Sequence, residues 1–550
     1  MSPTSSSSPL KSSPLELPIN IIPLPVGIQR AERIPFHWNA TTKIHSLGNE
    51  TLPIEKYLSE SLAQRTGITA GKASSGSNTI VLQVTPSFII DGPDWAIAEA
   101  YQLICTPQQI TIVARTPHGL FNGVQTLIQL VTSSNDQWVV PSLTIDDHPR
   151  FQWRGLMLDC CRHFSTVPEV CRLIDLMAFY KLNTFHWHLT EDQGWRIEVK
   201  AYPRLTEVGA WRSESPVMGE AKVGDGQPYG GFYTQDDLRT VVAYAATRHV
   251  TVIPEIEMPG HCTACIASYP ELGNDDIPEW RVPETGTKWG VIARTLSPKE
   301  ETFDFIAKVF DEILPIFPSP YVHIGGDEAP KEEWKNSPFA QKVMKENGLQ
   351  DEHELQSYFI RRVEKLLHER GKKLIGWDEI QEGGLSPSAT MMVWRDWKWA
   401  KQALELGNNI IVTHNEHTYF DYGQGEKPEG PEYEMIGNER TLDKVYHFDP
   451  IPEGTPPGRI HQVLGCQGQL WCEFIWSPDK LDYMIWPRAC ALAEVAWSPL
   501  KSKDFTGFQQ RLVPHLDRFD ALKVNYRKAD GSPAKPYASM TRRFMRPPLT

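Results

Sequence analysis

The sequence predicts an α/β chain in which a (β/α)8 barrel follows a smaller α+β domain. Between residues 151 and 500, short apolar runs alternate with amphipathic helical patterns, and the alternation occurs eight times. Eight strand–helix repeats are the number that closes a parallel barrel. Polar and aromatic residues follow nearly every predicted strand, which is where barrels of this kind carry their active sites.

The chain has 550 residues, too many for one compact core. Residues 1–14 are rich in Ser and Pro and are predicted to be a disordered tail. Strand-like runs at Asn20–Leu24, Arg33–Trp38, Thr79–Val84, Ala100–Cys105 and Gln109–Ala114, then a helical pattern at Gly119–Val131, predict an α+β domain over residues 15–150. The barrel is predicted over residues 151–500, and residues 501–550 are expected to form an extension that packs on it.

The predicted barrel elements follow in order along the chain. The strands are Gly155–Asp159, Asn183–Leu189, Thr251–Glu257, Tyr321–Ile324, Lys373–Trp377, Met391–Arg395, Asn409–His414 and Val463–Leu470. The helical patterns between and after them are Pro168–Lys181, Thr234–His249, Glu300–Phe317, Glu354–Arg370, Trp399–Leu406 and Leu481–Trp497.

The most informative strand end follows Tyr321–Ile324, where Gly325 and Gly326 precede the adjacent carboxylates Asp327 and Glu328. Adjacent residues of a strand point to opposite faces, but at a strand end that relaxes into a loop both can reach one cleft. Two acids in one cleft repel when both are charged, so one tends to keep its proton at neutral pH and can act as an acid. This arrangement suits cleavage of an acid-labile bond such as a glycosidic linkage. The plain alternative is a solvated turn with two exposed charges.

Composition limits the classes of function. Hydrophobic residues make up 40% and charged residues 22%, as in ordinary soluble proteins, and the net charge of −13 argues against nucleic-acid and anionic-membrane partners. The 18 tryptophans favour carbohydrate binding, because indole faces stack on sugars, although core packing accounts for many of them. No apolar run of about 18 residues predicts a membrane span, and no apolar signal-peptide core is visible after Met1. The expected compartment is the cytoplasm, with secretion as the alternative.

The nine cysteines are an odd number without a framework spacing. Cys262 and Cys265 form a C-x-x-C pair, but no second pair follows at the distance of a zinc site. We therefore expect neither a metal nor another cofactor.

Six short motifs occur in order, and together they resemble the β-N-acetylhexosaminidases of glycoside hydrolase family 20. They are Arg162-His163-Phe164, Phe185-His186-Trp187-His188-Leu189, Pro259-Gly260-His261, Gly325-Gly326-Asp327-Glu328, Gly376-Trp377-Asp378-Glu379 and Leu470-Trp471-Cys472-Glu473. The resemblance covers roughly residues 151–499, and the preceding module looks like the non-catalytic domain found before the barrel in that family.

The resemblance implies substrate-assisted chemistry with retained configuration, in which the substrate's own 2-acetamido oxygen attacks the anomeric carbon and forms an oxazolinium intermediate. By the same resemblance, Glu328 is the general acid and base, Asp327 accepts the acetamide N–H, and Tyr419 donates to the acetamide oxygen. Asp192 and His261 look like the pair that supports the acid. Trp377, Trp394 and Trp471 look like a box around the acetamide, and Arg162, Asp421 and Glu473 like the residues that bind the terminal sugar hydroxyls.

The family resemblance implies an exo-acting enzyme that removes terminal GlcNAc or GalNAc from chitooligosaccharides or glycoconjugates. Paired barrels occur in the family, so a homodimer is a further expectation. Glu191 stands where many relatives have a second aspartate, and the loop after the seventh strand offers only Tyr446 and Phe448 near the position of a further family tryptophan. Residues 224–231 and 273–289 are expected to border the pocket.

Two alternatives remain. His186, His188, Asp192 and His261 could be ligands of a metal-dependent barrel hydrolase, although we interpret the two strand histidines as hydrogen-bonded core residues. A non-catalytic sugar-binding barrel would lack a residue of the reaction, whereas Asp327, Glu328 and Tyr419 are all present.

Overall fold

The structure is a computed structural model that describes residues 17–31, 33–71, 78–217, 220–425 and 438–535. The predicted disordered tail lies outside these residues. Two compact units are present: the smaller contains most described residues up to Asp147, and the larger contains residues 22–24, 93–96 and those from His148 onward.

The smaller unit is built on a six-stranded mixed sheet in the order β1-β9-β5-β6-β4-β3, with a separate three-stranded sheet β2-β8-β7. Its strands are β1 Gly27–Arg30, β2 Phe36–Trp38, β3 Lys43–Leu47, β4 Thr79–Val84, β5 Tyr101–Cys105, β6 Gln109–Ala114, β7 Thr132–Ser134, β8 Gln137–Val140 and β9 Leu143–Asp147. Its two long helices are α1 Leu52–Thr66 and α3 Pro117–Leu130. The short helix α2, Asp94–Ile97, falls mostly in the segment 93–96 that is assigned to the larger unit.

Of the features of this unit that differ from the sequence-based prediction, two have a clear physical cause. Asn20–Leu24 is not a strand, because Pro23 cannot donate a ladder hydrogen bond, and the first strand begins only at Gly27. Helix α1 was not predicted, because its buried stripe is narrow and consists of Ile54, Leu58 and Leu62.

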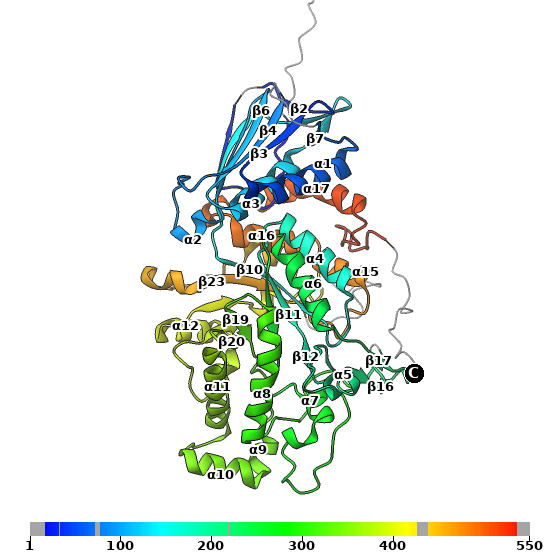
Figure 1. Ribbon diagram of the computed structural model, residues 1–550, viewed down its shortest axis with the longest axis vertical. Coiled ribbons are helices and arrows are strands. Elements are labelled where there is room, and N and C mark those ends of the chain that lie inside the picture. The colour runs from blue at the N-terminus through cyan, green and yellow to red at the C-terminus, as the bar shows by residue number, and fades with distance from the viewer. Residues whose placement is uncertain (1–16, 32, 72–77, 218–219, 426–437, 536–550) are drawn as a thin grey trace, which may run out of the picture. The chain divides into compact units, whose positions relative to one another are not determined.

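The larger unit contains a closed barrel of eight strands, β10-β11-β18-β19-β20-β21-β22-β23, in which every neighbouring pair is parallel (Figure 1). The ring closes where β10 pairs with β23. The strands are β10 Trp153–Asp159, β11 Thr184–His188, β18 Thr251–Glu255, β19 Tyr321–His323, β20 Lys373–Trp377, β21 Thr390–Val393, β22 Ile410–Val412 and β23 Val463–Gly468. All eight predicted strands are confirmed, and with them the fold class.

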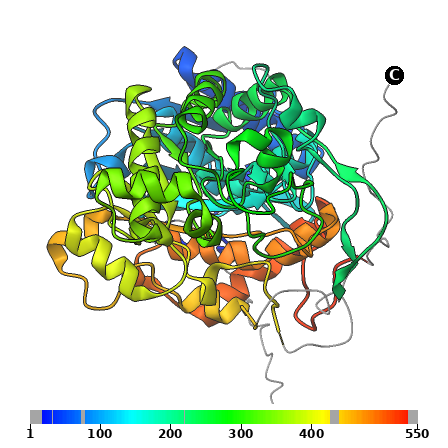
Figure 2. The same cartoon turned by 90° about the horizontal axis from the view of Figure 1, so that it is seen from below.

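Helices surround the barrel strands (Figure 2). The helices that follow barrel strands are α4 Val167–Phe179, α6 Gln235–Ala246, α8 Glu300–Ile313, α11 Glu352–Glu369, α12 Trp397–Leu406, α15 Pro478–Ile485 and α16 Arg488–Trp497. The predicted single helix Leu481–Trp497 is in fact the two helices α15 and α16, because Pro487 at the break has no N–H for an intrahelical bond.

Shorter helices and strands lie in the connections between the barrel strands. The helices are α5 Arg204–Glu207, α7 Thr263–Ser268, α9 Glu332–Asn336, α10 Pro338–Asn347, α13 Asn415–Thr418 and α14 Leu442–His447. The strands are β12 Thr190–Glu191, β13 Gly194–Trp195, β14 Trp211–Arg212, β15 Pro216–Val217, β16 Glu220–Gly224 and β17 Tyr229–Gly230.

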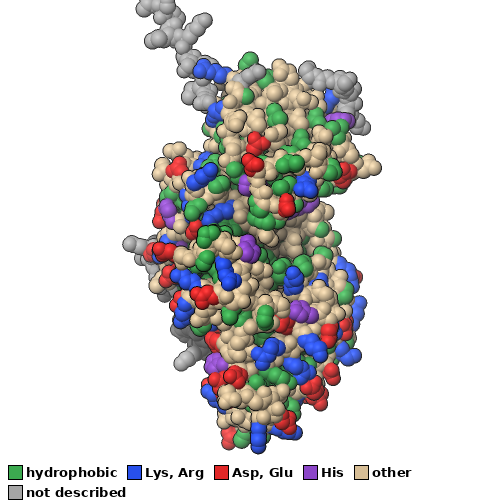
Figure 3. All heavy atoms as spheres, turned by 90° about the vertical axis from the view of Figure 1, so that its left-hand side faces the viewer, with side chains coloured by type: hydrophobic (Ala, Val, Ile, Leu, Met, Phe, Trp, Pro, Cys, Tyr) green, Lys and Arg blue, Asp and Glu red, His purple; other side chains and the backbone are tan. Residues whose placement is uncertain are grey.

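The last described helix, α17 (Phe505–Ala521), packs within the larger unit. Its Phe519 ring lies 5.2 Å from the Trp486 ring, and the Tyr180 hydroxyl lies 3.1 Å from His515 Nδ1. Acidic and basic side chains are interspersed on the face shown in Figure 3. No helix in the described part of the chain combines the length and hydropathy needed to cross a bilayer.

Candidate active site at the carboxyl ends of the barrel strands

A tight turn after β19 places the two adjacent carboxylates. Gly325 and Gly326 take φ values of 66° and 88°, which only glycine adopts readily. Beyond them, Asp327 Oδ2 lies 3.7 Å and Glu328 Oε2 lies 3.5 Å from the same atom, His261 Nε2. Both carboxylates therefore reach one cleft, as the strand-end argument predicts.

The turn also needs the space that a glycine leaves. A Cβ on Gly325 would lie 1.6 Å from Glu257 Oε2, which is buried. Gly325→Ala is expected to lower the free energy of unfolding by about 2–5 kcal/mol, because it adds left-handed strain and displaces a buried carboxyl group. Gly348 has φ 67° and open space around it, so Gly348→Ala should cost only about 1–2 kcal/mol. Denaturant unfolding of both variants measures the difference, and equal losses would contradict the steric argument.

The two carboxylates have different surroundings. Asp327 is buried, and burial, with smaller contributions from nearby carboxylates, raises its pKa to about 7. The Glu328 side chain is 43% exposed, and its hydrogen bond with His261 holds its pKa below the ordinary value. The sequence argument requires one retained proton, and the resemblance assigns the acid role to Glu328. In this structure the proton favours Asp327 instead, because Asp327 is the more deeply buried of the two.

Two carboxylates contact His261 Nδ1, where the resemblance implies only Asp192. His261 Nδ1 lies 2.7 Å from Glu191 Oε1 but 3.5 Å from Asp192 Oδ2. Asp192 Oδ1 accepts instead from the backbone N–H and hydroxyl of Thr263, at 2.9 and 2.5 Å. Burial opposes protonation of His261, but Glu191 and Asp327 raise its pKa well above the ordinary value. The imidazolium that faces Glu328 is therefore held mainly by Glu191.

Arg162, Asp421 and Glu473 come together at another side of the site. The Arg162 guanidinium contacts Glu191 Oε2 at 3.0 Å and donates to Gln193 Oε1 at 2.8 Å. Asp421 Oδ1 and Glu473 Oε2 are buried and have no hydrogen-bond partner among the described residues. Burial and the neighbouring Glu473 raise the pKa of Asp421 well above its ordinary value. Buried acceptors of this kind require a donor, and sugar hydroxyls supply one.

Aromatic side chains form the wall of the site. The Trp377 and Trp471 rings lie 5.7 Å apart, and the Trp394 ring stacks on Tyr419 at 6.0 Å with an interplanar angle of 22°. Two of the indole N–H groups donate to carboxylates. Trp377 Nε1 donates to Glu255 Oε1 at 2.8 Å, and Trp394 Nε1 donates to Glu379 Oε2 at 3.0 Å. The three tryptophans and Tyr419 thus meet at one place, as the resemblance implies.

A buried network below this wall was missed by the sequence reasoning. Glu255 contacts His186 Nε2 at 3.0 Å and His323 Nδ1 at 2.8 Å, and it also contacts His188 Nδ1. Burial lowers the pKa of His186 to about 4, whereas Glu255 and Glu191 overcome burial and raise that of His188 to about 10. His186 and His188 are hydrogen-bonded core histidines, as predicted. An acid inside the apolar run Thr251–Glu257 was the available signal for Glu255.

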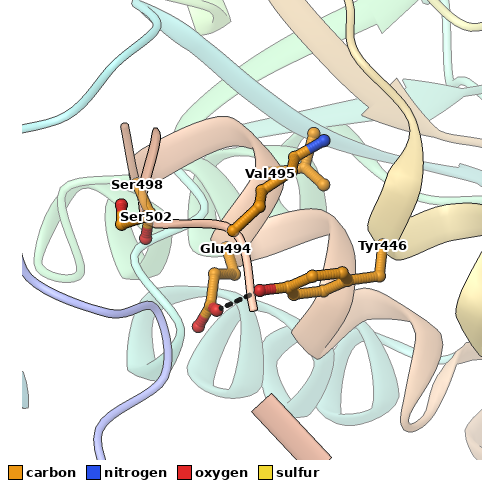
Figure 4. A pocket seen from close by; sticks show the side chains of 6 residues that line it. Tyr446, Glu494, Val495, Ser498 and Ser502 are labelled. Atoms are coloured by element: carbon orange, nitrogen blue, oxygen red, sulfur yellow. Dashed lines mark hydrogen bonds between the residues drawn. The ribbon is translucent and has the colours of Figure 1, made fainter. Parts of the chain in front are cut away.

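The aromatic residues considered for the leaving-group side lie elsewhere. Tyr446 in α14 donates to Glu494 at 3.1 Å and packs on Phe505 and Phe508, as Figure 4 shows for its hydroxyl contact. Phe448 is also buried, with its ring 5.0 Å from that of His417. Neither residue lines the cleft beside Glu328, because both side chains are buried in contacts with other parts of the larger unit.

The loop after β18 borders the arginine side of the site. The backbone carbonyl of Lys288 accepts from Gln193 Nε2 at 2.7 Å, and the Trp289 ring lies 5.7 Å from the His163 ring and 5.1 Å from the Arg212 guanidinium. In the other segment expected to border the pocket, residues 224–231, the Tyr229 hydroxyl accepts the Phe164 backbone N–H at 2.7 Å, and the Tyr229 ring lies 5.4 Å from the His163 ring.

Comparison with known proteins accounts for both units. The family model described as the catalytic domain of glycosyl hydrolase family 20 matches residues 151–500, and the model of domain 2 of that family matches residues 18–148. The chain belongs to glycosyl hydrolase family 20.

Curated relatives agree with this membership. A beta-hexosaminidase of Porphyromonas gingivalis is 43% identical over 521 residues, which are 92% of this chain and 64% of the relative. A beta-hexosaminidase of Vibrio furnissii is 40% identical over 76% of this chain and 67% of its own length. The chain therefore spans less than two thirds of the Porphyromonas relative.

Solved family 20 structures share the fold. The exo beta-N-acetylglucosaminidase of Vibrio harveyi in complex with N-acetylglucosamine aligns with a TM-score of 0.81 and 35% identity, covering 95% of this chain and 81% of that one. A mutant Streptomyces plicatus beta-hexosaminidase in complex with its product GlcNAc aligns with a TM-score of 0.78 and 30% identity, covering 95% and 98%. In this chain His261 contacts both Glu191 and Asp192, and the contact with Glu191 is the shorter of the two.

Proposed function

We propose that this chain is an exo-acting, retaining β-N-acetylhexosaminidase that removes terminal GlcNAc or GalNAc by substrate-assisted catalysis. One observation carries the proposal: Asp327 and Glu328 meet at His261 beside a wall formed by three tryptophans and Tyr419. The names of the relatives support the same activity. Chitooligosaccharides and glycoconjugates are the proposed substrates.

The proposed reaction has two steps. The acetamide oxygen of the substrate attacks the anomeric carbon while Glu328 gives its proton to the departing glycosidic oxygen. Asp327 accepts the acetamide N–H and stabilises the positive charge that grows on the ring, and Tyr419 orients the acetamide oxygen. Glu328, now ionised, takes a proton from water as the water opens the oxazolinium ion from the opposite face. Two inversions at one carbon retain the configuration.

The exo mode is proposed from the group Arg162, Asp421 and Glu473. Two carboxylate oxygens of this group lack a hydrogen-bond partner among the described residues and can accept from hydroxyls of a terminal sugar, and Arg162 is held in place by Glu191 and Gln193. Buried polar atoms without a partner gain a hydrogen bond when a sugar hydroxyl reaches them, so these groups can bind one sugar end tightly. The cytoplasmic location and the paired barrels stay predictions.

Hydrolysis of aryl β-GlcNAc and β-GalNAc glycosides tests the proposal directly. The purified protein should release the aryl alcohol from at least one of them, and proton NMR of the first product should show the β anomer, because two inversions occur. Release of the α anomer first, or no hydrolysis of either glycoside, would contradict the proposed mechanism.

A chelation arm of the same assay addresses the metal-dependent alternative. His186 and His188 contact Glu255, whereas His261 contacts Glu191 and Asp192 contacts Thr263, so protein partners already occupy the four proposed ligands. Activity should therefore survive dialysis against a strong chelator. Loss of activity that a divalent metal restores would favour the metal-dependent hydrolase, and binding without turnover would favour the non-catalytic sugar-binding barrel.

A further inference from the structure

A cleft of about 410 Å³ lies beside the candidate acid. Glu328 and Trp394 line it, so it is continuous with the site described above. Its other walls come from the loop after β19, the start of α11, and the segments that follow β20 and β21. The volume lies in the range of small-molecule sites.

We propose that this cleft binds the leaving-group sugar and that Lys331 is the residue that positions it. The inference rests on the proposed hydrolase function and adds a subsite to it. A general acid must approach the leaving oxygen to about 3 Å, so the sugar attached to that oxygen has to lie next to Glu328. The cleft is a space of suitable size that borders Glu328.

Lys331 lines the cleft three residues after Glu328 in the chain. Its ammonium group donates to the Ala329 carbonyl at 2.7 Å and to Gln356 Oε1 at 2.5 Å. Gln356 in turn donates to the Gly326 carbonyl at 2.8 Å. An ammonium group has three N–H donors, and the two hydrogen bonds to described residues leave one for a ligand. The side chain is therefore held at a fixed place with a donor to spare.

The charges around the cleft favour a neutral ligand. Glu382 lies 3.0 Å from an Arg395 Nη atom and Glu379 lies 3.6 Å from Arg395 Nε, so charges of both signs face one another in the cleft wall. Trp394 is the one large apolar aromatic side chain among the cleft-lining residues. Hydroxyl-rich ligands fit such a mixed polar wall better than an anionic or an apolar leaving group does. A neutral saccharide is therefore the class of leaving group that we infer.

A comparison of two substrates tests the subsite. The β-1,4-linked disaccharide of GlcNAc places a sugar in the cleft, whereas an aryl GlcNAc glycoside has no hydroxyls there. Lys331→Met keeps the length and apolar stem of the side chain and removes its donors. The variant should lose about tenfold or more in kcat/KM for the disaccharide and keep the aryl glycoside activity within about twofold, since a charged hydrogen bond is lost with only one substrate.

His353→Ala provides an independent variant at the start of α11, which also lines the cleft. The His353 side chain is 51% exposed, so its removal should not disturb folding, and disaccharide kcat/KM should fall about threefold. Lys342→Ala is the matched control, because Lys342 is an exposed lysine outside the cleft. Its kinetics should equal those of the unmodified protein with both substrates.

The outcomes separate the subsite from the function on which it depends. Equal losses with both substrates in Lys331→Met, or no loss with either, would overturn the leaving-group assignment while leaving the hydrolase intact. Failure of the unmodified protein to cleave the aryl glycoside would instead overturn the proposed function.

Discussion

A β-glucoside without the 2-acetamido group should be hydrolysed at least about 10⁵-fold more slowly than the matching GlcNAc glycoside. The attacking oxygen in the proposed reaction belongs to the substrate, and well-oriented intramolecular groups reach effective molarities of about 10⁵–10⁸ M. Asp327 and Tyr419 can orient that oxygen only if the acetamide is present. The measurement is kcat/KM for two glycosides with the same aryl leaving group.

A matched variant sharpens this comparison. Asp327→Ala should strongly reduce hydrolysis of the GlcNAc glycoside, because the acetamide loses its acceptor and its counter-charge. Any residual glucoside hydrolysis should change little, since that substrate never used the contact. Rapid hydrolysis of the glucoside, or a covalent bond between the sugar and a side chain, would show that the protein supplies its own nucleophile.

Replacing Glu328 with glutamine should lower turnover of a substrate with a sugar leaving group by about 10²-fold or more. Glutamine has a similar shape but cannot give up a proton, so the loss should be small for an activated leaving group that departs without protonation. Rates with the disaccharide and with a dinitrophenyl glycoside measure this contrast. A nearly normal rate with the disaccharide would remove Glu328 from the role of acid.

The protonation of the pair gives the same variant a second signature. In this structure the proton favours Asp327, whose pKa is about 7, while His261 keeps the pKa of Glu328 low. A bound acetamide N–H stabilises ionised Asp327, and a sugar that covers Glu328 raises its pKa by desolvation. Substrate binding should therefore move the shared proton to Glu328, where the reaction needs it.

The sign of the pH dependence follows from this shared proton. In the unmodified protein, kcat/KM should fall as pH rises above about 7, because the pair then loses its last proton. In Glu328→Gln with the activated substrate, kcat/KM should instead rise through the pKa of Asp327 and then level off, because only ionised Asp327 is required. An unmodified enzyme whose rate still climbs above pH 9 would contradict the assignment.

The hydrophobic pattern of the sequence was sufficient to predict the eight-stranded barrel. Eight apolar runs separated by amphipathic segments were enough to place every barrel strand, and each observed strand ends no more than two residues before its predicted end. Strand ends of a parallel barrel meet at one rim, so the turn at Gly325–Glu328 and the aromatic exits at Trp377 and Trp471 could be grouped before any contact was known. Order along the chain carries that information.

The order of residues along the chain does not show which side chains contact one another in the folded protein. Glu191 and Asp192 are adjacent, and which of them bonds His261 depends on how the β12–β13 hairpin turns. Tyr446 lies in a loop region along the chain, yet helix packing buries it against Glu494. Glu255, at the end of β18, meets His186 and His188 of β11 and His323 of β19 only once these strands lie side by side in the ring.

Proton placement shows the same division most clearly. Two neighbouring acids indicate that one proton will be shared, because like charges repel at short range. Which acid keeps it depends on differences in burial and on the approach of His261, a residue more than sixty positions earlier in the chain. Repeating local patterns are thus readable from residue order, whereas desolvation and pairing arise from long-range packing and need the folded coordinates.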